Sequence, residues 1–357
     1  MLKKWLNVAL LVAAIGATAV GQSGVTLNGA GATFPALLYQ KWAKEFKTQT
    51  GVEINYQAIG SGGGIKAIQD QTVDFGGSDA WLKDDNIVDI PTVAGAVTLT
   101  FNVPALGCTL KLSKLALANI FLGKIRKWND GVIAAINGGC KLPDANITVV
   151  HRSDGSGTTN IFTSYLSKIS EEWKTKVGAG TSVNWPTDAL GGLAGPGNAG
   201  VTQAVTQNPN SLGYVELIYA RQNKLPVADV ENAKGKFVTP TLDTTRAALA
   251  GITTIPADFN LSSEVLDVNA DGVYPIVGPT YLLVYKDFRN IKDAAKAQAL
   301  VDLLCWAVNS NGKSLGQDFA DDLDFAALPS NVTTAANNVV KTLTFQGKSV
   351  NTARFCK

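Results

Sequence analysis

The chain has 357 residues, of which 46% are hydrophobic and 17% charged, so it is long enough for two hydrophobic cores and too apolar for a disordered protein. Its 31 lysines and arginines stand against 29 aspartates and glutamates, and without Lys3 and Lys4 the two counts are equal. A chain so close to neutrality lacks a broad positive field, which disfavours nucleic acid as a partner and means that local geometry must hold any bound anion.

The N-terminus has the pattern of a secretory signal peptide. Two lysines precede an almost wholly apolar run at 5–15, and small residues follow it. The run is shorter than the roughly 20 residues that a membrane span needs, and no cysteine directly follows it to carry a lipid. We therefore expect residues 1–21 to be a signal peptide, cleaved between Ala19 and Gln22, and the mature protein to be exported.

Strand-like and helix-like segments alternate along the rest of the chain. The clearest helix follows Pro35, because Leu38, Trp42 and Phe46 recur at helical spacing. The elements expected in chain order are a helix at 35–46, a strand at 52–58, a helix turn at 65–71, strands at 72–75, 92–102 and 147–150, and helices at 160–166 and 291–308. Such alternation predicts an α/β fold with a largely parallel sheet. The glycine-rich stretch at 191–200 is interpreted as a flexible loop at the rim of a cleft.

Four short segments rich in glycine and hydroxyl groups lie at the junctions between these elements. They are GAGATF at 29–34, GSGGG at 60–64, GGSD at 76–79 and HRSDGSGTT at 151–159. Pro35 suits the first turn of a helix, which would place Thr33 or Phe34 at the helix N-cap. Ser61 lies at a second loop-to-helix junction, and Asp79 ends a turn that follows a strand. Glycines at such junctions let the backbone approach a ligand closely.

The segment at 151–159 combines the donors that an anion needs. Its Gly-Ser-Gly-Thr run presents backbone N–H groups and hydroxyls at a predicted helix start, where unpaired N–H groups and the helix dipole attract anions. Arg152 adds a fork of donors suited to a tetrahedral oxyanion, and Asp154 can hold that guanidinium in place. A single glycine-rich turn is usually structural, but three such junctions and an Arg–Asp pair together favour an anion-binding site.

The four cysteines are Cys108, Cys140, Cys305 and Cys356. An even number of cysteines in an exported chain suggests disulfides, and the sequence has no CxxC motif or Cys/His cluster that would suggest a metal site. Three pairings are possible, and free thiols are the remaining alternative.

Several longer motifs carry a resemblance to one known family. In chain order they are GAGATFPA at Gly29, YQAIGSGGG at Tyr56, TVDFGGSDA at Thr72, LGKIRKW at Leu122, RSDGSGTT at Arg152, NWP at Asn184, GYVELIYA at Gly213 and LDFAALP at Leu323. With these motifs in this order, residues 25–329 resemble the substrate-binding protein of the phosphate-specific ABC transporter.

The resemblance implies a two-lobed α/β periplasmic-binding-protein fold of type II, with hinge strands and the ligand in the interlobe cleft. Lobe 1 would comprise 22–104 plus 276–357, and lobe 2 would comprise 105–275. We favour the disulfides Cys108–Cys140 and Cys305–Cys356, because each then lies within one lobe. The protein would bind inorganic phosphate in the periplasm and deliver it, as a monomer, to the membrane permease and ATPase subunits of an ABC importer.

The ligand positions of the resembled family fall on the four segments. They are Thr33, the backbone of Phe34, Ser61 and Asp79 from lobe 1, and Arg152, Ser156, Gly157 and Thr158 from lobe 2, with Asp154 bracing the arginine. Two positions depart from the common pattern of the family. Gly62 stands where a second small hydroxyl residue is frequent, and His151 stands where a second arginine is frequent.

Asp79 is the residue that we expect to choose among oxyanions. At neutral pH phosphate carries at least one proton and sulfate carries none, whereas an ionised aspartate can only accept hydrogen bonds. Asp79 would therefore accept a hydrogen bond from protonated phosphate but would repel sulfate. A binder of sulfate or molybdate is for this reason the disfavoured alternative.

A catalytic role is the alternative from another class. His151, Asp154 and Ser156 have the residue types of a triad, but residues so close in one turn rarely reach one another correctly, and no GxSxG elbow surrounds Ser156. In an extended strand His151 would face away from Arg152. The sequence also lacks the His/Asp/Glu spacing of a metal site, which phosphoester hydrolysis usually exploits. We expect a binding protein without metal or cofactor, with an exported phosphatase or phosphotransferase using Ser156 or Thr158 as the alternative.

Overall fold

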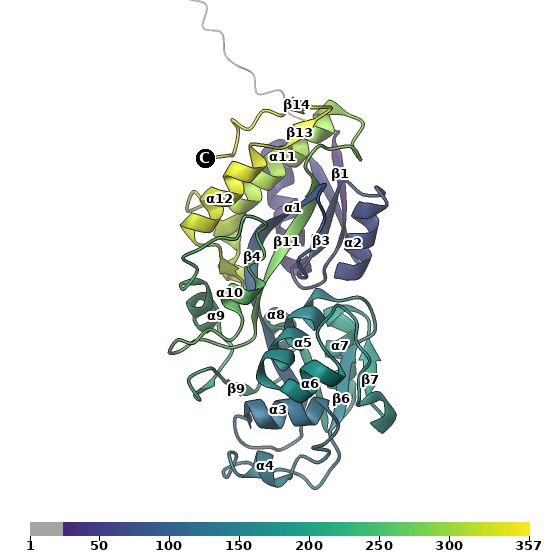
Figure 1. Ribbon diagram of the computed structural model, residues 1–357, viewed down its shortest axis with the longest axis vertical. Coiled ribbons are helices and arrows are strands. Elements are labelled where there is room, and N and C mark those ends of the chain that lie inside the picture. The colour runs from purple at the N-terminus through teal and green to yellow at the C-terminus, as the bar shows by residue number, and fades with distance from the viewer. Residues whose placement is uncertain (1–23) are drawn as a thin grey trace, which may run out of the picture.

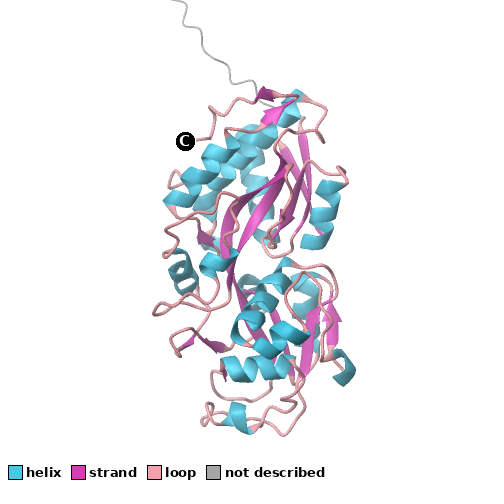
Figure 2. Ribbon diagram, viewed as in Figure 1, coloured by secondary structure: helices cyan, strands magenta, loops and turns pink. Residues whose placement is uncertain are grey.

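One long strand, β4 (Ile87–Asn102), runs through both of the α/β lobes seen in Figure 1. The computed structural model describes residues 24–357, so the expected signal peptide at 1–21 and its cleavage site lie outside the described residues. In both lobes the strands lie between helices (Figure 2). A strand covered on both faces is mostly apolar, and β4 is buried at nearly every position.

The sheet of the first lobe has the strand order β2–β1–β3–β11–β4, and β12 also pairs with β4. Its other strands are β1 (Thr26–Gly31), β2 (Glu53–Ala58), β3 (Phe75–Ser78), β11 (Val277–Tyr285) and β12 (Ala326–Ala327). β1 is parallel to β2 and β3, whereas β11 is antiparallel to β3 and β4. The helical segments are α1 (Ala36–Thr50), α2 (Ser61–Gln69), α11 (Ala294–Val308), α12 (Ser330–Val340) and the 3₁₀ turns η2 (Gly316–Phe319) and η3 (Asp321–Leu323). Right-handed crossovers place α1 and α2 on opposite faces of this sheet.

The sheet of the second lobe begins where β4 changes partner, at Val97, and has the order β4–β8–β6–β7. Its other strands are β6 (Thr148–Arg152), β7 (Leu193–Gly195) and β8 (Ser211–Glu216). β6 is parallel to both of its neighbours, and β8 is antiparallel to β4. The helical segments are α3 (Lys114–Phe121), α4 (Gly131–Ala134), α5 (Gly157–Ile169), α6 (Glu171–Lys176), η1 (Asp188–Leu190), α7 (Gly197–Gln207) and α8 (Leu217–Gln222).

The remaining elements lie beside the two main sheets. They are β5 (Lys111–Leu112), β9 (Asp229–Glu231), β10 (Phe237–Val238), α9 (Leu242–Leu249), α10 (Ser262–Val265), β13 (Thr344–Phe345) and β14 (Lys348–Ser349). α9 packs against β4 and β12, and α10 packs against β11. These two helices lie within the range predicted for lobe 2 but contact strands of the first lobe. The lobe boundaries at 104 and 276 therefore stay a prediction.

A hydrophobic core extends through both lobes along β4. The stripe of Leu38, Trp42 and Phe46 on α1 is buried, as its helical spacing predicts. Trp128 and Trp306 are wholly buried in the second and first lobe. Among residues 24–357, none of the helices has the length and apolar character of a membrane span.

Two disulfides link segments that are distant in the sequence. Cys108 is bonded to Cys140, and Cys305 of α11 is bonded to Cys356 near the C-terminus, which is the pairing favoured from the sequence. The bridges join residues 32 and 51 positions apart. Chain-entropy relations assign loops of this size about 4 kcal/mol each.

Most predicted elements are confirmed, with ends shifted by a few residues. The helices expected at 35–46, 160–166 and 291–308 correspond to α1, α5 and α11, and the strands expected at 52–58, 92–102 and 147–150 correspond to β2, β4 and β6. Element ends depend on caps and neighbours more than on periodicity, which explains the shifts.

The prediction of a turn over Gly76–Asp79 is wrong. Gly76 and Gly77 belong to β3, which lies between β1 and β11, and Asp79 follows the end of that strand. A Cβ on Gly77 would lie 2.2 Å from the Tyr56 hydroxyl oxygen, and one on Gly76 would lie 3.1 Å from the Gly64 carbonyl oxygen. Close packing on the strand, and not a change of chain direction, accounts for these glycines.

The flexible loop expected at 191–200 is also wrong. Leu193–Gly195 form β7 beside β6, and α7 begins at Gly197. A Cβ on Gly195 would lie 2.4 Å from the carbonyl carbon of Gly200, so glycine here permits close packing of the strand against the helix. Pairing with β6, which local composition does not reveal, orders this segment.

Candidate anion-binding site

The four predicted segments meet where the two lobes face each other. In the first lobe Thr33 follows β1, Ser61 begins α2 and Asp79 follows β3. In the second lobe Arg152 ends β6 and Ser156 precedes α5. Carboxyl ends of parallel strands share one edge of a sheet, so the loops that follow them converge.

Glycines bring the two lobes into contact at this junction. A Cβ on Gly157 would lie 2.5 Å from the Cβ of Asp79 and 2.6 Å from the Oγ of Ser61. The N–H of Gly62 donates to the carbonyl oxygen of Gly155 at 2.9 Å, and a Cβ on Gly62 would lie 3.0 Å from the Gly155 Cα. Glycine at position 62, in place of a hydroxyl residue, therefore permits a close backbone contact between the lobes.

Asp79 is buried, with 1% of its surface exposed, and its carboxylate is hydrogen-bonded. Thr280 Oγ1 donates to Oδ1 at 2.7 Å, and Ser61 Oγ donates to Oδ2 at 3.3 Å. A bulge between β11 and β4 at Thr280 accompanies this contact. Burial raises the pKa of Asp79 to about 7, although the Thr280 bond and the charge of Arg152 oppose the rise. The carboxyl group is thus an acceptor that titrates near neutral pH.

Arg152 and Asp154 form a bidentate ion pair at the end of β6. Arg152 Nε donates to Asp154 Oδ1 at 2.8 Å and Nη2 donates to Oδ2 at 2.5 Å, while the N–H of Gly197 also donates to Oδ1 at 2.9 Å. Burial alone would raise the pKa of Asp154, but the bonds and charge of Arg152 outweigh it and lower that pKa. Asp154 therefore stays ionised and holds the buried guanidinium in one orientation.

The start of α5 presents donors beside this arginine. Ser156 is the N-cap, and its Oγ accepts the N–H of Thr159 at 3.1 Å. Gly157 and Thr158 occupy the first two helical positions, whose N–H groups have no partner within a helix. Thr158 Oγ1 lies 3.3 Å from Arg152 Nη1, from which it accepts a hydrogen bond. The positive end of the helix dipole adds to this donor set.

Thr33 and Phe34 occupy the loop between β1 and α1, but neither caps the helix as predicted. Pro35 is the N-cap and makes no side-chain capping bond. Thr33 Oγ1 instead accepts hydrogen bonds from the second lobe, and the Phe34 ring is buried against Gly95 and Phe325. Tertiary contacts across the junction therefore replace the local cap that the sequence pattern favours.

Three residues of the junction were not predicted from the sequence. Asn198 bonds Thr33 and Thr158, Tyr219 Oη donates to the Thr33 carbonyl oxygen at 2.5 Å, and Thr280 bonds Asp79. Each comes from a segment far from its partner in the chain. For Asn198 a signal exists, because Pro196 before the apolar period of Val201 and Val205 marks a helix start.

Comparisons with known proteins show which family the chain belongs to. A family model described as a PBP superfamily domain matches residues 12–305. The phosphate-binding protein PstS of Methanocaldococcus jannaschii is 44% identical over 313 residues, which are 82% of this chain and 80% of that protein. The PstS of Pasteurella multocida is 40% identical over 338 residues, covering 93% of this chain and 94% of that protein. The chain belongs to the PstS family.

The fold of this PstS family member also matches solved structures. A high-affinity periplasmic phosphate-binding protein with bound phosphate superposes with a TM-score of 0.68 at 23% identity, covering 88% of this chain and 93% of that chain. At this identity the likeness concerns the fold. The two-lobed α/β fold expected from the sequence is thereby confirmed.

His151, a departure from the pattern of the resembled family, is engaged away from Ser156. Its Nε2 lies 2.7 Å from Asp188 Oδ1, its Nδ1 lies 2.9 Å from the Arg152 carbonyl oxygen, and its ring stacks on Trp185. Ser156 is meanwhile the cap of α5. Within residues 24–357, moreover, no cluster of three or more His, Cys, Asp or Glu side chains is arranged to hold a metal ion. The contacts of His151 and Ser156 therefore give the catalytic-triad interpretation no support.

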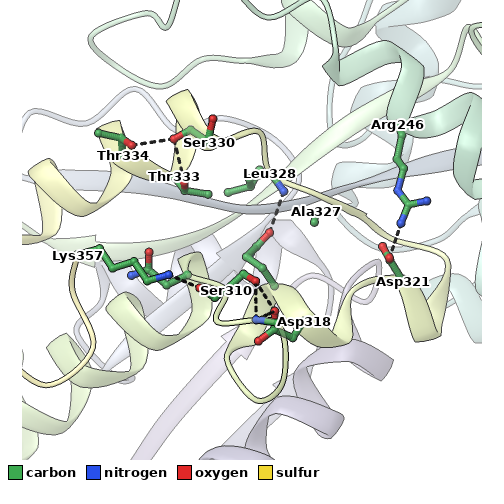
Figure 3. Close-up of a pocket in the computed structure, with 13 residues that line it drawn as sticks. Arg246, Ser310, Asp318, Asp321, Ala327, Leu328, Ser330, Thr333, Thr334 and Lys357 are labelled. Carbon is green, nitrogen blue, oxygen red and sulfur yellow. Dashed lines mark hydrogen bonds and ion pairs between the residues drawn. The ribbon is translucent and has the colours of Figure 1, made fainter.

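A separate hollow of about 650 Å³ lies on the first lobe, and none of the predicted ligand residues lines it (Figure 3). Arg246 reaches across it to Asp321, and the Lys357 side chain donates to the Ser310 carbonyl oxygen. Asp318 accepts several backbone N–H groups in the same region. Its charged groups are therefore engaged within the protein, and the junction between the lobes remains the candidate site of this PstS family member.

Proposed function

We propose that this protein binds inorganic phosphate in the periplasm and delivers it to the membrane permease and ATPase subunits of an ABC importer. The PstS relatives are named phosphate-binding proteins, and the N-terminal pattern is typical of export. The proposed ligands are Thr33, the Phe34 backbone, Ser61, Asp79, Arg152, Ser156, Gly157 and Thr158. The protein would act as a monomer, with the lobe boundaries near 104 and 276.

The observation that carries the proposal is one buried carboxylate among many donors. Asp79 lies against Ser61 and Gly157. Arg152 and Thr158 are hydrogen-bonded to each other in the second lobe. A tetrahedral oxyanion would satisfy the donors. Its own proton would satisfy Asp79, which a fully deprotonated anion cannot do.

The same geometry sets the expected selectivity. An unpaired repelling carboxylate in a buried site costs several kcal/mol and can reject an analogue by about 10⁴-fold. Sulfate, which carries no proton at neutral pH, would leave an ionised Asp79 in that state. Protonated phosphate would not, so the site favours phosphate over sulfate.

Titration of the purified mature protein with phosphate and with sulfate tests the proposal. Tryptophan fluorescence and calorimetry should show saturable phosphate binding, and sulfate should bind at least about a thousandfold more weakly. Calorimetry without phosphate-dependent heat, or equal affinity for both anions, would overturn the proposal. A colorimetric phosphoester assay on the same sample should detect no turnover. Turnover that the Ser156→Ala variant loses would favour the phosphatase alternative.

A further inference from the structure

Asn198 lies at the start of α7, directly where the two lobes touch. Its side chain is wholly buried, and it comes one residue after Gly197, whose N–H donates to Asp154. α7 and α5 both belong to the second lobe, and both begin at the face that meets the first lobe (Figure 1). Asn198 is therefore placed to contact both sides of the proposed phosphate site.

The amide of Asn198 is held in one orientation. Its Oδ1 accepts the N–H of Glu216, at the end of β8, at 2.9 Å. Its Nδ2 must then face the other way, where it donates to Thr33 Oγ1 at 2.9 Å and to Thr158 Oγ1 at 3.2 Å. The backbone N–H of Asn198 adds a third donor, again to Thr33 Oγ1, at 3.1 Å. These partners identify Oδ1 as the acceptor and Nδ2 as the donor of the amide.

These bonds determine where two hydroxyl protons go. A threonine hydroxyl has two acceptor lone pairs and one proton. Both lone pairs of Thr33 Oγ1 accept from Asn198, and those of Thr158 Oγ1 accept from Asn198 and Arg152. With their acceptor capacity used, both hydroxyls can only donate to a ligand. A proton on that ligand therefore cannot be accepted by these two hydroxyls, whereas the Asp79 carboxylate can accept it.

The Thr33 bonds also join the two lobes. Thr33 follows β1 of the first lobe, while Asn198 belongs to the second. Lobe closure around a ligand would bring these groups together, and release would separate them. Their loss therefore acts on the closed state and leaves the open state unchanged.

We propose that Asn198 is a positioning residue that latches the closed state and fixes Thr33 and Thr158 as hydrogen-bond donors to the anion. This inference rests on the proposed function, because it concerns the same site. It assigns to the start of α7 a role in holding the bound anion, in addition to that of α5.

Stopped-flow phosphate binding to the mature protein and its Asn198→Ala variant tests the proposal. Dissociation should become faster by on the order of tenfold or more, as loss of two to three neutral hydrogen bonds implies, while association stays within about twofold. Asn208→Ala is the matched control. Asn208 is the C-cap of the same helix, and its Nδ2 donates a hydrogen bond only to the Ala204 carbonyl oxygen among the described residues. Its rates should equal those of the wild type. Unchanged dissociation in Asn198→Ala would overturn the proposal.

A double-mutant cycle with Thr33→Val separates positioning from general stability. If Asn198 acts through the Thr33 hydroxyl, Asn198→Ala should have a clearly smaller effect on affinity in the Thr33→Val background than in the wild type. Fully multiplicative effects would contradict the proposal.

Asn198→Asp is the second variant, should Asn198→Ala fold poorly. It keeps the acceptor for Glu216 but turns the Nδ2 donor into an acceptor, so both threonine protons would be drawn away from the anion. Phosphate affinity should fall further than in Asn198→Ala, and wild-type affinity would overturn the proposal. Wild-type protein that binds no phosphate would instead refute the proposed function itself.

Discussion

Asp79 and Arg152 share the interlobe junction but have different hydrogen-bond partners. The Arg152 guanidinium donates two short hydrogen bonds to the Asp154 carboxylate, which pairs its charge and fixes its orientation. Asp79 has only hydroxyl donors and a more distant arginine, so burial raises its pKa to about 7. Arg152 is thus a donor held in one orientation, whereas Asp79 exchanges a proton near neutral pH and, when ionised, accepts a hydrogen bond from a protonated ligand.

Asp79→Asn tests this division of roles. The amide can donate to a deprotonated oxyanion, so sulfate affinity should rise relative to phosphate affinity, by at least about tenfold in the ratio. Competition binding with the two anions measures the ratio. An unchanged ratio would remove Asp79 as the discriminating residue.

Asp89 on β4 makes the stability of the folded protein depend on pH, separately from the proposed phosphate site. Its side chain is 1% exposed, Oδ2 accepts the Leu82 N–H at 2.7 Å, and Oδ1 has no partner among the described residues. Burial raises its pKa to about 7, opposed by the Leu82 bond and reinforced by Asp258 and Asp84. A folded-state pKa above the unfolded value of about 3.9 means that stability declines as pH rises between about 4 and 7.

Asp89→Asn should remove that decline. The amide oxygen keeps the Leu82 bond, so at pH 8 the variant should be more stable by up to about 4 kcal/mol, and the gain should shrink as the pH falls towards 4. Urea unfolding at pH 8 and pH 5 measures both values. A gain that is the same at both pH values would show that Asp89 does not titrate as stated.

Among the elements, the connection from α11 to η2 depends on a single carboxylate. Asp318 Oδ2 accepts the N–H groups of Lys313, Ser314 and Leu315 at 2.9–3.0 Å. Burial opposes ionisation, but the bonds from Ser310 and the backbone outweigh it and lower the pKa of Asp318 to about 2. A lowered pKa means that this stabilisation is present above about pH 4 and is lost as pH falls towards 2.

Asp318→Ala should therefore destabilise the first lobe by about 2–4 kcal/mol at pH 7, because several backbone donors lose their acceptor together. The exposed Asp322 nearby is the control, and Asp322→Ala should stay within about 0.5 kcal/mol of the wild type. Urea denaturation measures both. Equal stability of the two variants would contradict the anchoring role.

For the whole molecule, donors contributed by both lobes imply that phosphate binding closes the cleft. The lobes meet over Gly157, where a Cβ would approach the Asp79 Cβ to 2.5 Å. The contact is between two rigid elements, the start of α5 and the loop after β3. Closure should therefore tolerate no side chain at this position.

Gly157→Ala should weaken phosphate binding by about a hundredfold while leaving the thermal midpoint of the ligand-free protein near that of the wild type. Gly138→Ala is the control, since a Cβ there would meet nothing within 4 Å. Small-angle scattering should show a compaction on adding phosphate that the wild type and the control share. Identical scattering with and without phosphate in the wild type would argue against closure.

Sequence alone determined the features that depend on neighbours along the chain. The helix stripe of α1, the donor-rich start of α5 and the Arg152–Asp154 pair follow from local spacing, because caps and helix faces are set within a few residues. The motifs around them extended this to the family, the two-lobed fold and the candidate ligand set.

Tertiary structure decided what depends on long-range packing. Gly76 and Gly77 form a strand because they pair with β1 and β11, and Tyr56 and Ile68 leave no room for a side chain there. Asn198 bridges the lobes because pairing with β6 orders the segment before it. The pairing of β4 with β8, the bonds between Thr33 and Asn198, and the bond between Asp79 and Thr280 join residues more than 100 positions apart. Local composition carries no signal for such contacts, because their geometry exists only once both sheets have formed.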